Sequence, residues 1–369
     1  MKGQWIGKYT GDVDGKIMVN IDEIDDYSQC VAYLIPHNKS FPGSVAYISS
    51  LKSHEAKQTA KAYVSPVDPR TGFQSTWEEV KEFFSKDIAH SKEGDVSIEI
   101  EGDTLSLSAN TDIGVKVEAT LSKPTDSPES KIVGDKVSWQ EFKQQISAIS
   151  KTRFLFRGQR ERWRLRTAFH RAGRYRISEF TKRDVKLLHN RLSSITSHYF
   201  DLSIPEQNGA FFNLIQHHGY PTPLLDWSYS PYVAAFFAFR DWPNALENGE
   251  DYARIYIFDR DSWVVRYPQI QNLDPAYPHL SVMEFIAINN PRLVPQQSVT
   301  TVTNIDDIEA YLLEKELESD TKYLHAYDIP ASEREVAMRE LRFMGITAGS
   351  MFPSIDGICE ELKEQNFEI

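Results

Sequence analysis

The decisive stretch of this chain reads Leu224-Leu225-Asp226-Trp227-Ser228-Tyr229-Ser230-Pro231-Tyr232-Val233-Ala234-Ala235-Phe236-Phe237-Ala238. It is a short apolar run, then a group of polar residues, then a second apolar run. Ser230 and Pro231 suit the N-cap and first turn of a helix, so the pattern predicts a buried strand followed by a buried helix. Hydroxyls and a carboxylate between two such elements are typical of a small-molecule site in an α/β or α+β domain.

Length and composition indicate an ordinary globular protein. The 369 residues suffice for about two domains, and no apolar run approaches the roughly 20 residues that span a membrane. The first residues, from Met1 to Trp5, have no signal-peptide core. The two cysteines, Cys30 and Cys359, lie far apart, which fits a reducing compartment and argues against a disulfide scaffold. We therefore expect a cytoplasmic protein.

The charge is distributed unevenly. The net charge is −12, yet the segment from Lys136 to Arg191 carries 16 Lys and Arg against 4 Asp and Glu. Residues 151–176 hold ten of these cations and one acid, Glu161. This segment indicates an anionic partner, either a nucleotide diphosphate or a nucleic-acid backbone. The alternative is a solvated face that pairs with the acidic remainder of the chain.

Residues 1–122 carry the alternating apolar pattern of β-strands. Asp14-Gly15 lies between two such segments and is a hairpin signal. One helix, from Thr76 to Phe84, interrupts the strands. We expect a small β-sandwich or barrel that regulates, binds a partner or presents a target, because it carries no catalytic constellation. The expected strand segments are Trp5–Tyr9, Ile17–Ile21, Cys30–Ile35, Val96–Ile100, Leu105–Leu107 and Ile113–Leu121.

A polar, Pro-containing linker, residues 123–136, leads into a second part, residues 137–369. Helix and strand patterns mix there, so we expect an α+β fold. The expected strands are Phe154–Phe156, Arg254–Phe258 and the strand-like segment Arg292–Val302. The expected helices are Trp139–Ile149, Asp184–Phe200, Asp306–Glu318 and one that a capping box at Ser332–Glu335 opens and that ends near Gly345.

The strand end Phe156-Arg157-Gly158-Gln159 is a candidate anion site. A glycine after the arginine lets the backbone turn sharply beside a fixed guanidinium, which binds phosphate or carboxylate bidentately. The alternative is a structural arginine that ties down a helix end or a buried carboxylate.

The dipeptide His217-His218 offers further chemistry. Adjacent histidines cannot both face one site, and a metal would need a third ligand besides Asp226, so we expect no metal. A Ser–His–Asp hydrolase built from Ser228, His217 and Asp226 lacks the G-x-S-x-G elbow. A third polar cluster, Arg292 with Gln296–Thr300, suits a ribose or amide, or a polar strand edge.

Several ordered motifs resemble the FRG domain over roughly residues 137–360. They are Phe156-Arg157-Gly158-Gln159, Trp163-x-Leu165, Arg171, Gln216-His217-x-Gly219, Pro221-Thr222-x-Leu224-Leu225-Asp226-Trp227-Ser228, Pro231-x-Val233-Ala234 and the tail Gly345 to Gly357. Residues 1–122 lie outside this resemblance.

The FRG pattern is in turn similar to the ADP-ribosyltransferase core, which implies a split sheet with helices and NAD as substrate. The resemblance places Arg157 and Gly158 on the NAD phosphates, with Arg292 in the same cofactor site. It places Ser228 and Ser230 in the nicotinamide–ribose pocket.

Two positions depart from that core. Its third element is a strand with a catalytic Glu, whereas Arg292–Val302 offers Gln296 and Gln297 and no acid. Because an oxocarbenium charge develops during the reaction, a carboxylate is needed, and Asp226 is the preferred substitute with Glu284 second. Pro223 also stands where FRG sequences commonly carry Arg.

Three readings follow for these residues. The first is an ADP-ribosyltransferase, of the glycosyltransferase class, that modifies a nucleic acid or protein; His217 and Ser228 contact the ribose or nicotinamide, and Gln297 bonds a ribose hydroxyl. By analogy such an enzyme is a bacterial toxin or anti-phage effector with an antitoxin or regulatory partner. The second is a nucleotide- or nucleic-acid-binding module without catalysis. The third makes Asp226 and Trp227 plain core residues.

Overall fold

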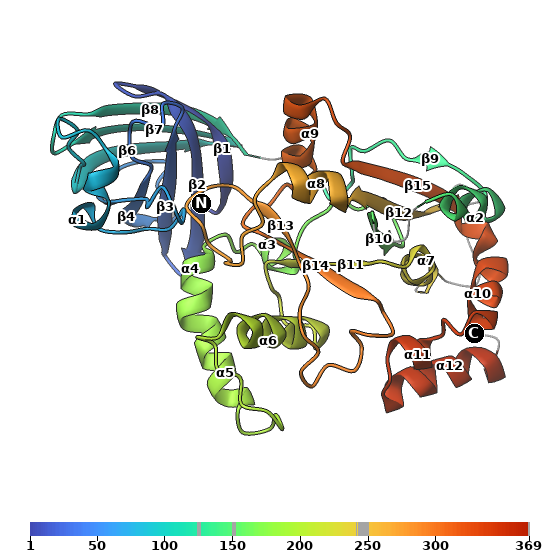
Figure 1. Ribbon diagram of the computed structural model, residues 1–369. Helices are drawn as coiled ribbons and strands as arrows, with labels where there is room; N and C mark the ends of the chain where they lie inside the picture. The colour runs from blue at the N-terminus through green and yellow to red at the C-terminus, as the bar shows by residue number, and fades with distance from the viewer. Residues whose placement is uncertain (124–126, 150–152, 241, 243–250, 368–369) are drawn as a thin grey trace.

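A computed structural model of the chain describes residues 1–123, 127–149, 153–240, 242 and 251–367 (Figure 1). It contains two sheets, a closed barrel and a seven-stranded mixed sheet with helices. The α+β class expected from the sequence is therefore confirmed at this level. Of the two architectures expected for the N-terminal part, the protein adopts the barrel.

Eight antiparallel strands, joined in chain order, form the barrel, and β1 closes it by pairing with both β2 and β8. Alternate residues such as Trp5, Val19 and Ile98 fill its interior. The expected helix is a short one, α1 (Trp77–Val80), continued by a 3-10 turn at Lys81–Phe83. The strands are β1 (Gly3–Gly11), β2 (Gly15–Ile24), β3 (Tyr27–Pro36), β4 (Ser44–Lys52), β5 (Lys57–Pro66), β6 (Glu93–Glu101), β7 (Thr104–Thr111) and β8 (Lys116–Ser122).

The second sheet has the strand order β13-β14-β11-β10-β12-β15-β9. All neighbours are antiparallel except β15 and β9, so β10 lies near the centre with β11 and β12 on its two sides. Its strands are β9 (Asp135–Lys136), β10 (Phe154–Gln159), β11 (Leu224–Ser228), β12 (Tyr252–Asp259), β13 (Leu280–Met283), β14 (Ser298–Thr303) and β15 (Leu324–Pro330). The predicted buried strand at Leu224–Ser228 is confirmed as β11.

Helices cover both faces of this sheet. On one face, α7 (Pro231–Phe239) packs with α2 (Trp139–Ser147) and α10 (Arg334–Phe343) in one apolar core. On the other face, α8 (Arg260–Arg266) and α9 (Ile308–Ser319) cover Tyr256 and Phe258 of β12. A third core surrounds α5 (Lys186–Leu192) and α6 (Pro205–His217). As predicted, Ser230 caps α7, its Oγ accepting from the Val233 N–H at 3.3 Å.

Three expected elements differ from the structure. Helix α5 ends at Leu192, and a π-helical turn at Phe180–Val185 precedes it, so the expected helix Asp184–Phe200 is wrong in its second half. No capping box forms at Ser332, because residues 331–333 make a 3-10 turn, α10 begins only at Arg334, and the Glu335 carboxylate pairs with Arg339 at 3.5 Å instead. Residues 292–297 form turns, and only the later part of the expected strand becomes β14.

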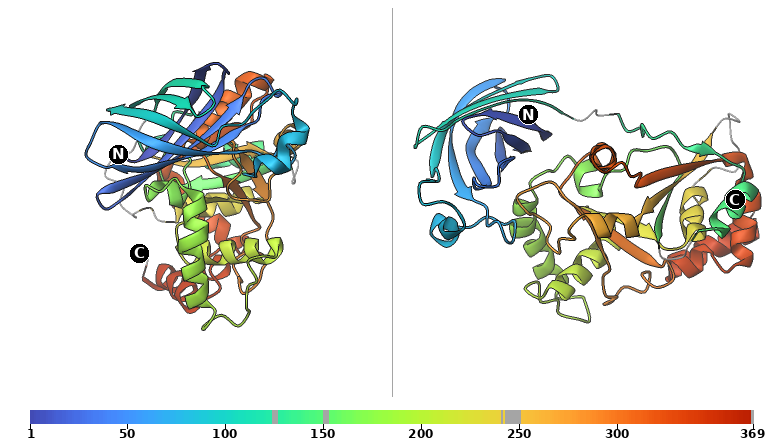
Figure 2. Two further views of the ribbon diagram at one scale, coloured as in Figure 1. Left: turned by 90° about the vertical axis from the view of Figure 1, so that its left-hand side faces the viewer. Right: turned by 45° about the horizontal axis from the view of Figure 1, so that its top comes forward.

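The barrel packs against the second part through the outer side of β2, β3 and β4 (Figure 2). Met18, Val31 and Tyr33 share an apolar cluster with Ala276, whose N–H donates to the Gly72 carbonyl at 2.8 Å. Within the described residues, no helix has the length and apolar character needed to cross a bilayer.

Candidate functional site

A cavity of about 800 Å³ opens where β10, β11 and the start of α7 meet. This volume lies within the range of roughly 300–1,000 Å³ that is typical of small-molecule sites. Asp226 is the one carboxylate among the described residues that line it. Seven arginines also line it, namely Arg157, Arg160, Arg164, Arg166, Arg171, Arg240 and Arg292.

Arg157 projects from the middle of the sheet. Its Nη1 donates to the main-chain carbonyl of Asp226 at 2.7 Å, which joins β10 to β11. Burial lowers the pKa of Arg157 to about 10, against an opposing effect of Asp226. The guanidinium is still charged at neutral pH, and its charge is held where water screens it little.

Gly158 has a role other than the sharp turn expected from the sequence. It lies inside β10, where a Cβ atom would stand 1.8 Å from the Ala234 carbonyl oxygen and 2.7 Å from the Ala238 nitrogen. The glycine is required because α7 packs directly on the strand. This close contact fixes the strand that carries Arg157 against the helix that follows Ser228.

Arg171 and Arg292 are also held by main-chain oxygens. Arg171 donates to the Arg166 carbonyl and Arg292 to the His217 carbonyl, each at 2.6 Å. The Arg292 guanidinium also lies 5.3 Å from the centroid of the Phe352 ring. Among the described residues, no carboxylate forms an ion pair with Arg157, Arg171 or Arg292. These three cations are therefore available to an anionic ligand.

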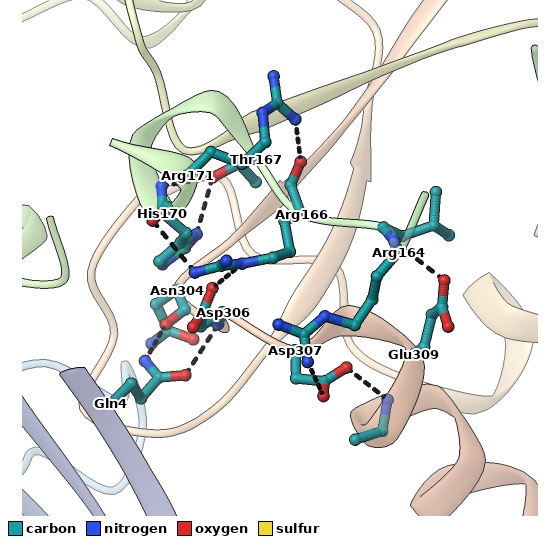
Figure 3. A network of polar contacts seen from close by, with 12 residues as sticks. Gln4, Arg164, Arg166, Thr167, His170, Arg171, Asn304, Asp306, Asp307 and Glu309 are labelled. Atoms are coloured by element: carbon teal, nitrogen blue, oxygen red, sulfur yellow. Dashed lines mark hydrogen bonds and ion pairs between the residues drawn. The ribbon is translucent and has the colours of Figure 1, made fainter. Parts of the chain in front are cut away.

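A polar network joins Arg166 and Arg171 to the barrel (Figure 3). Gln4 of β1, fully buried, accepts from the Asp306 N–H at 2.8 Å and donates to the Asn304 carbonyl at 2.7 Å. The Asp306 carboxylate accepts from Arg166 Nε at 2.5 Å, and Arg166 supplies the carbonyl that holds Arg171. The barrel thus fixes one wall of the cavity.

Ion pairs explain most of the basic segment 151–176. Lys151 lies outside the described residues. Of the described cations in this segment, all but Arg157 and Arg171 have a carboxylate partner. Asp22 of the barrel, for example, accepts from Arg174 Nε at 2.9 Å and from the Tyr175 N–H at 2.6 Å. Most of these cations therefore pair with carboxylates of the same chain, as the alternative interpretation of this segment expects.

The Asp226 carboxylate faces the same cavity and is oriented by α6. Its Oδ1 accepts from the Gln216 amide, and the Gln216 amide oxygen accepts from the Thr222 hydroxyl. The carboxylate is therefore held in one direction, toward a space surrounded by guanidinium groups.

His217 ends α6 and lines the cavity. Its Nδ1 lies 2.6 Å from the Asn290 amide nitrogen, while its buried Nε2 has no hydrogen-bond partner in the described structure. Burial lowers the pKa of His217, so the ring is neutral at neutral pH. The Asn290 amide nitrogen can only donate, so Nδ1 accepts and the proton lies on the buried Nε2.

The two serines have structural partners. Ser228 Oγ donates to the Gln296 carbonyl at 2.8 Å and accepts from the Ser230 N–H at 3.0 Å. Ser228 lines the cavity, whereas Ser230 caps α7 and is not among the lining residues. These hydroxyls first of all shape the turn between β11 and α7.

Two predicted residues lie elsewhere. Gln297 has a left-handed backbone (φ 46°) and an exposed side chain, and its neighbour Gln296 lines the cavity in its place. Glu284 follows β13, accepts from the Tyr229 hydroxyl and lines a different pocket, of about 590 Å³. The structure therefore brings neither Gln297 nor Glu284 into the lining of the Arg157 cavity.

Sequence reasoning gave no site role to Arg171, Gln216, Arg240 or Phe352. Arg171 and Gln216 belong to the FRG-like motifs, and this membership was the signal in the sequence that could have identified them as site residues. Arg240 pairs with Glu360 at 2.5 Å and lies 4.2 Å from the centroid of Phe352, a contact between segments over a hundred residues apart. Nothing local in the sequence shows it.

Comparison with known families agrees with the motifs. Residues 152–245 match the family model of the FRG domain. The match includes Arg157, Gly158, His217, Asp226 and Ser228, and it ends before Arg292 and Gln296. No curated protein matches the chain.

Among the described residues, no group of three His, Cys, Asp or Glu side chains is placed to hold a metal ion.

Proposed function

We propose that the second part of the chain is an ADP-ribosyltransferase-like enzyme that binds NAD in the arginine-lined cavity and transfers ADP-ribose to a macromolecule. The observation that carries this proposal is the meeting of Arg157, Arg171 and Arg292, none with a carboxylate ion pair among the described residues, with one oriented carboxylate, Asp226. A diphosphate supplies the negative charge that such a cavity lacks.

Each cavity residue has a role in this reaction. The three arginines bind the diphosphate, and His217 contacts the ribose or the nicotinamide. The bond between nicotinamide nitrogen and ribose C1′ breaks, and its electron pair leaves with the neutral nicotinamide. A nucleophile of the acceptor bonds to C1′ and releases a proton to water. The Asp226 carboxylate stabilises the positive charge that develops on the ribose.

The experiment is incubation of the chain with NAD, labelled in its ADP-ribose part, and cell extract. We expect nicotinamide release and transfer of label, and we expect Arg157→Ala to lower both at least about tenfold because charge-assisted hydrogen bonds to the diphosphate are lost. Arg153→Ala is the matched control, since Arg153 pairs with Asp259 at 2.7 Å outside the cavity lining. Absence of both reactions, or their survival in Arg157→Ala, contradicts the proposal.

A second function, nucleotide binding without turnover, is favoured by β14. Ser298 of β14 and Gln296 in the turn before it line the cavity, and neither of them is an acid. Asp226→Asn separates the two functions. An enzyme loses nicotinamide release while it keeps its affinity for ADP-ribose. A binding module releases no nicotinamide in either form.

The proposal names the acceptor of ADP-ribose only by its class, which is a nucleic acid or a protein. Removal of NAD or modification of an essential macromolecule harms a cell, so a toxin or anti-phage effector with a neutralising partner is the role that such an activity suits. The identity of the labelled product in the same extract, protein or nucleic acid, assigns the acceptor class.

A further inference from the structure

The barrel contains a second cavity, separate from the arginine-lined one, of about 140 Å³. All eight strands contribute to its lining, and every lining residue lies between Tyr9 and Val117. The lining is mostly Ala, Val, Ile and Leu. A closed barrel of eight strands is just wide enough either to be filled by its own side chains or to hold one small ligand.

Small inward-facing residues on neighbouring strands leave this space. Ala32 of β3 pairs with Ala46 of β4, and Ala62 of β5 lies between Ile48 of β4 and Gly94 of β6. At the other end of the barrel, large side chains fill the interior, among them Trp5, Ile21, Leu51, Leu105 and Leu121. The barrel is therefore packed at one end and hollow at the other.

The hollow end carries no charged side chain in its lining. Its polar groups include His90, whose Nε2 lies 3.1 Å from the Ser44 hydroxyl and whose pKa burial lowers, so the ring is neutral. Tyr9 also stays neutral, because burial raises its pKa to about 12. Phe41 and Ile113, 36% and 45% exposed, also line the cavity and present apolar surface to solvent.

We propose that the barrel binds a small, uncharged apolar molecule, about the size of one aromatic ring, in this cavity. The volume sets the size: apolar cavities of about 150 Å³ stay dry and bind benzene. The lining sets the chemistry, since it offers mostly apolar contact and no partner for a charge. The barrel therefore acts as a ligand-binding domain in addition to its contacts with the arginine-lined site.

The test uses fluorobenzene as the probe and the full chain with labelled alanine methyl groups. We expect saturable binding in ¹⁹F NMR and shifted methyl signals for Ala32, Ala46 and Ala62. The methyl signal of Ala234, which lines the other cavity, should not move. 4-Fluorobenzoate, of similar shape but charged, should not bind at this site.

A cavity-filling variant makes the test specific. Ala62→Leu places extra side-chain volume in the cavity and should weaken fluorobenzene binding at least tenfold. Thr59→Leu, at an exposed position of the same strand, should leave binding unchanged. Non-saturable binding, unmoved methyl signals of the barrel alanines, or full affinity in folded Ala62→Leu overturns the proposal. If Ala62→Leu does not fold, the methyl shifts of the unmodified chain decide the question alone.

Discussion

The two cavities of this protein are built in opposite ways. In the barrel, space exists because Ala32, Ala46 and Ala62 leave it unfilled, and no charged side chain lines it. In the mixed sheet, guanidinium groups line the space, and those of Arg157, Arg171 and Arg292 are each held by a main-chain carbonyl. An empty apolar cavity costs lost contacts, whereas buried charge costs desolvation.

The difference indicates which region suits the anionic ligand that we propose. Two of the three cations without carboxylate partners among the described residues, Arg157 and Arg292, are partly buried, and burying an unpaired charge is unfavourable for the fold. Their cost is offset once a ligand brings negative charge. The barrel, by contrast, also serves as a support, since Gln4 and Asp22 hold the chain that carries Arg166 and Arg171.

The largest expected effect is a loss of stability, and it compares how tightly the mixed sheet and the barrel are packed. Gly158→Ala places a Cβ atom 1.8 Å from the Ala234 carbonyl oxygen and should destabilise the protein by about 3 kcal/mol or more, because neither β10 nor α7 can move away alone. Gly94→Ala in the barrel, where the nearest atom, the Asn110 carbonyl oxygen, is 3.0 Å away, should cost less than about 1 kcal/mol.

Urea unfolding of both variants measures the difference. Equal destabilisation by the two substitutions would mean that the packing of α7 on β10 is no tighter than that of the barrel strands.

A smaller effect tests whether the barrel helps to hold the wall of the arginine-lined cavity in place. Gln4→Leu leaves the Asp306 N–H and the Asn304 carbonyl without their buried partner, so we expect a loss of about 2–4 kcal/mol in the free energy of unfolding. Because Asp306 then holds Arg166 less firmly, the affinity for ADP-ribose should also fall several-fold in calorimetric titration.

The control is Gln74→Leu, an exposed glutamine that contacts Tyr47 and Ser65 of the barrel itself. If Gln4→Leu weakens folding yet leaves ADP-ribose affinity at the level of this control, the two regions are independent.

The smallest effect concerns pH at the contact between the regions. Burial raises the pKa of Asp274 to about 6, although the Tyr33 hydroxyl of the barrel donates to this carboxylate at 3.1 Å. The folded state thus binds this proton more tightly than the unfolded state. The stabilisation is complete below about pH 4 and is lost as the pH rises through 6.

Asp274→Asn removes this dependence, since the amide stays neutral and its oxygen still accepts from Tyr33. We expect the variant to be more stable than the parent by on the order of 2 kcal/mol at pH 7 and equal to it near pH 4. The check is urea unfolding of both proteins from pH 4 to 7, and a stability difference that is flat or opposite in sign shows that the contact does not titrate this way.

The sequence predicted best where pattern and chemistry agree. The strand at Leu224–Ser228 and the helix after Ser230 follow from burial and capping and are confirmed as β11 and α7. Strands β4 and β5 were not expected, because they place Ala46, Ala60 and Ala62 where β-branched residues usually mark a strand. Two of these alanines, Ala46 and Ala62, also line the barrel cavity and leave it open.

The site was predictable in part. The motifs contain Arg157, Asp226 and His217, and the structure brings all three to one cavity. Gln297 lies outside this lining because the chain turns at residues 292–297, and Gln296 lines the cavity instead. Glu284 lies beside another pocket because of the register of β13 against β14. Neither turn nor register is encoded within a few neighbouring residues.

The central claim is that the arginine-lined cavity binds the diphosphate of a dinucleotide. A crystal structure of the chain with ADP-ribose tests it most directly. The account predicts diphosphate oxygens within hydrogen-bond distance of Arg157 and of Arg171 or Arg292, with a ribose near Asp226 and His217. ADP-ribose bound at another surface, or bound in the cavity with its phosphates away from all three arginines, would contradict it.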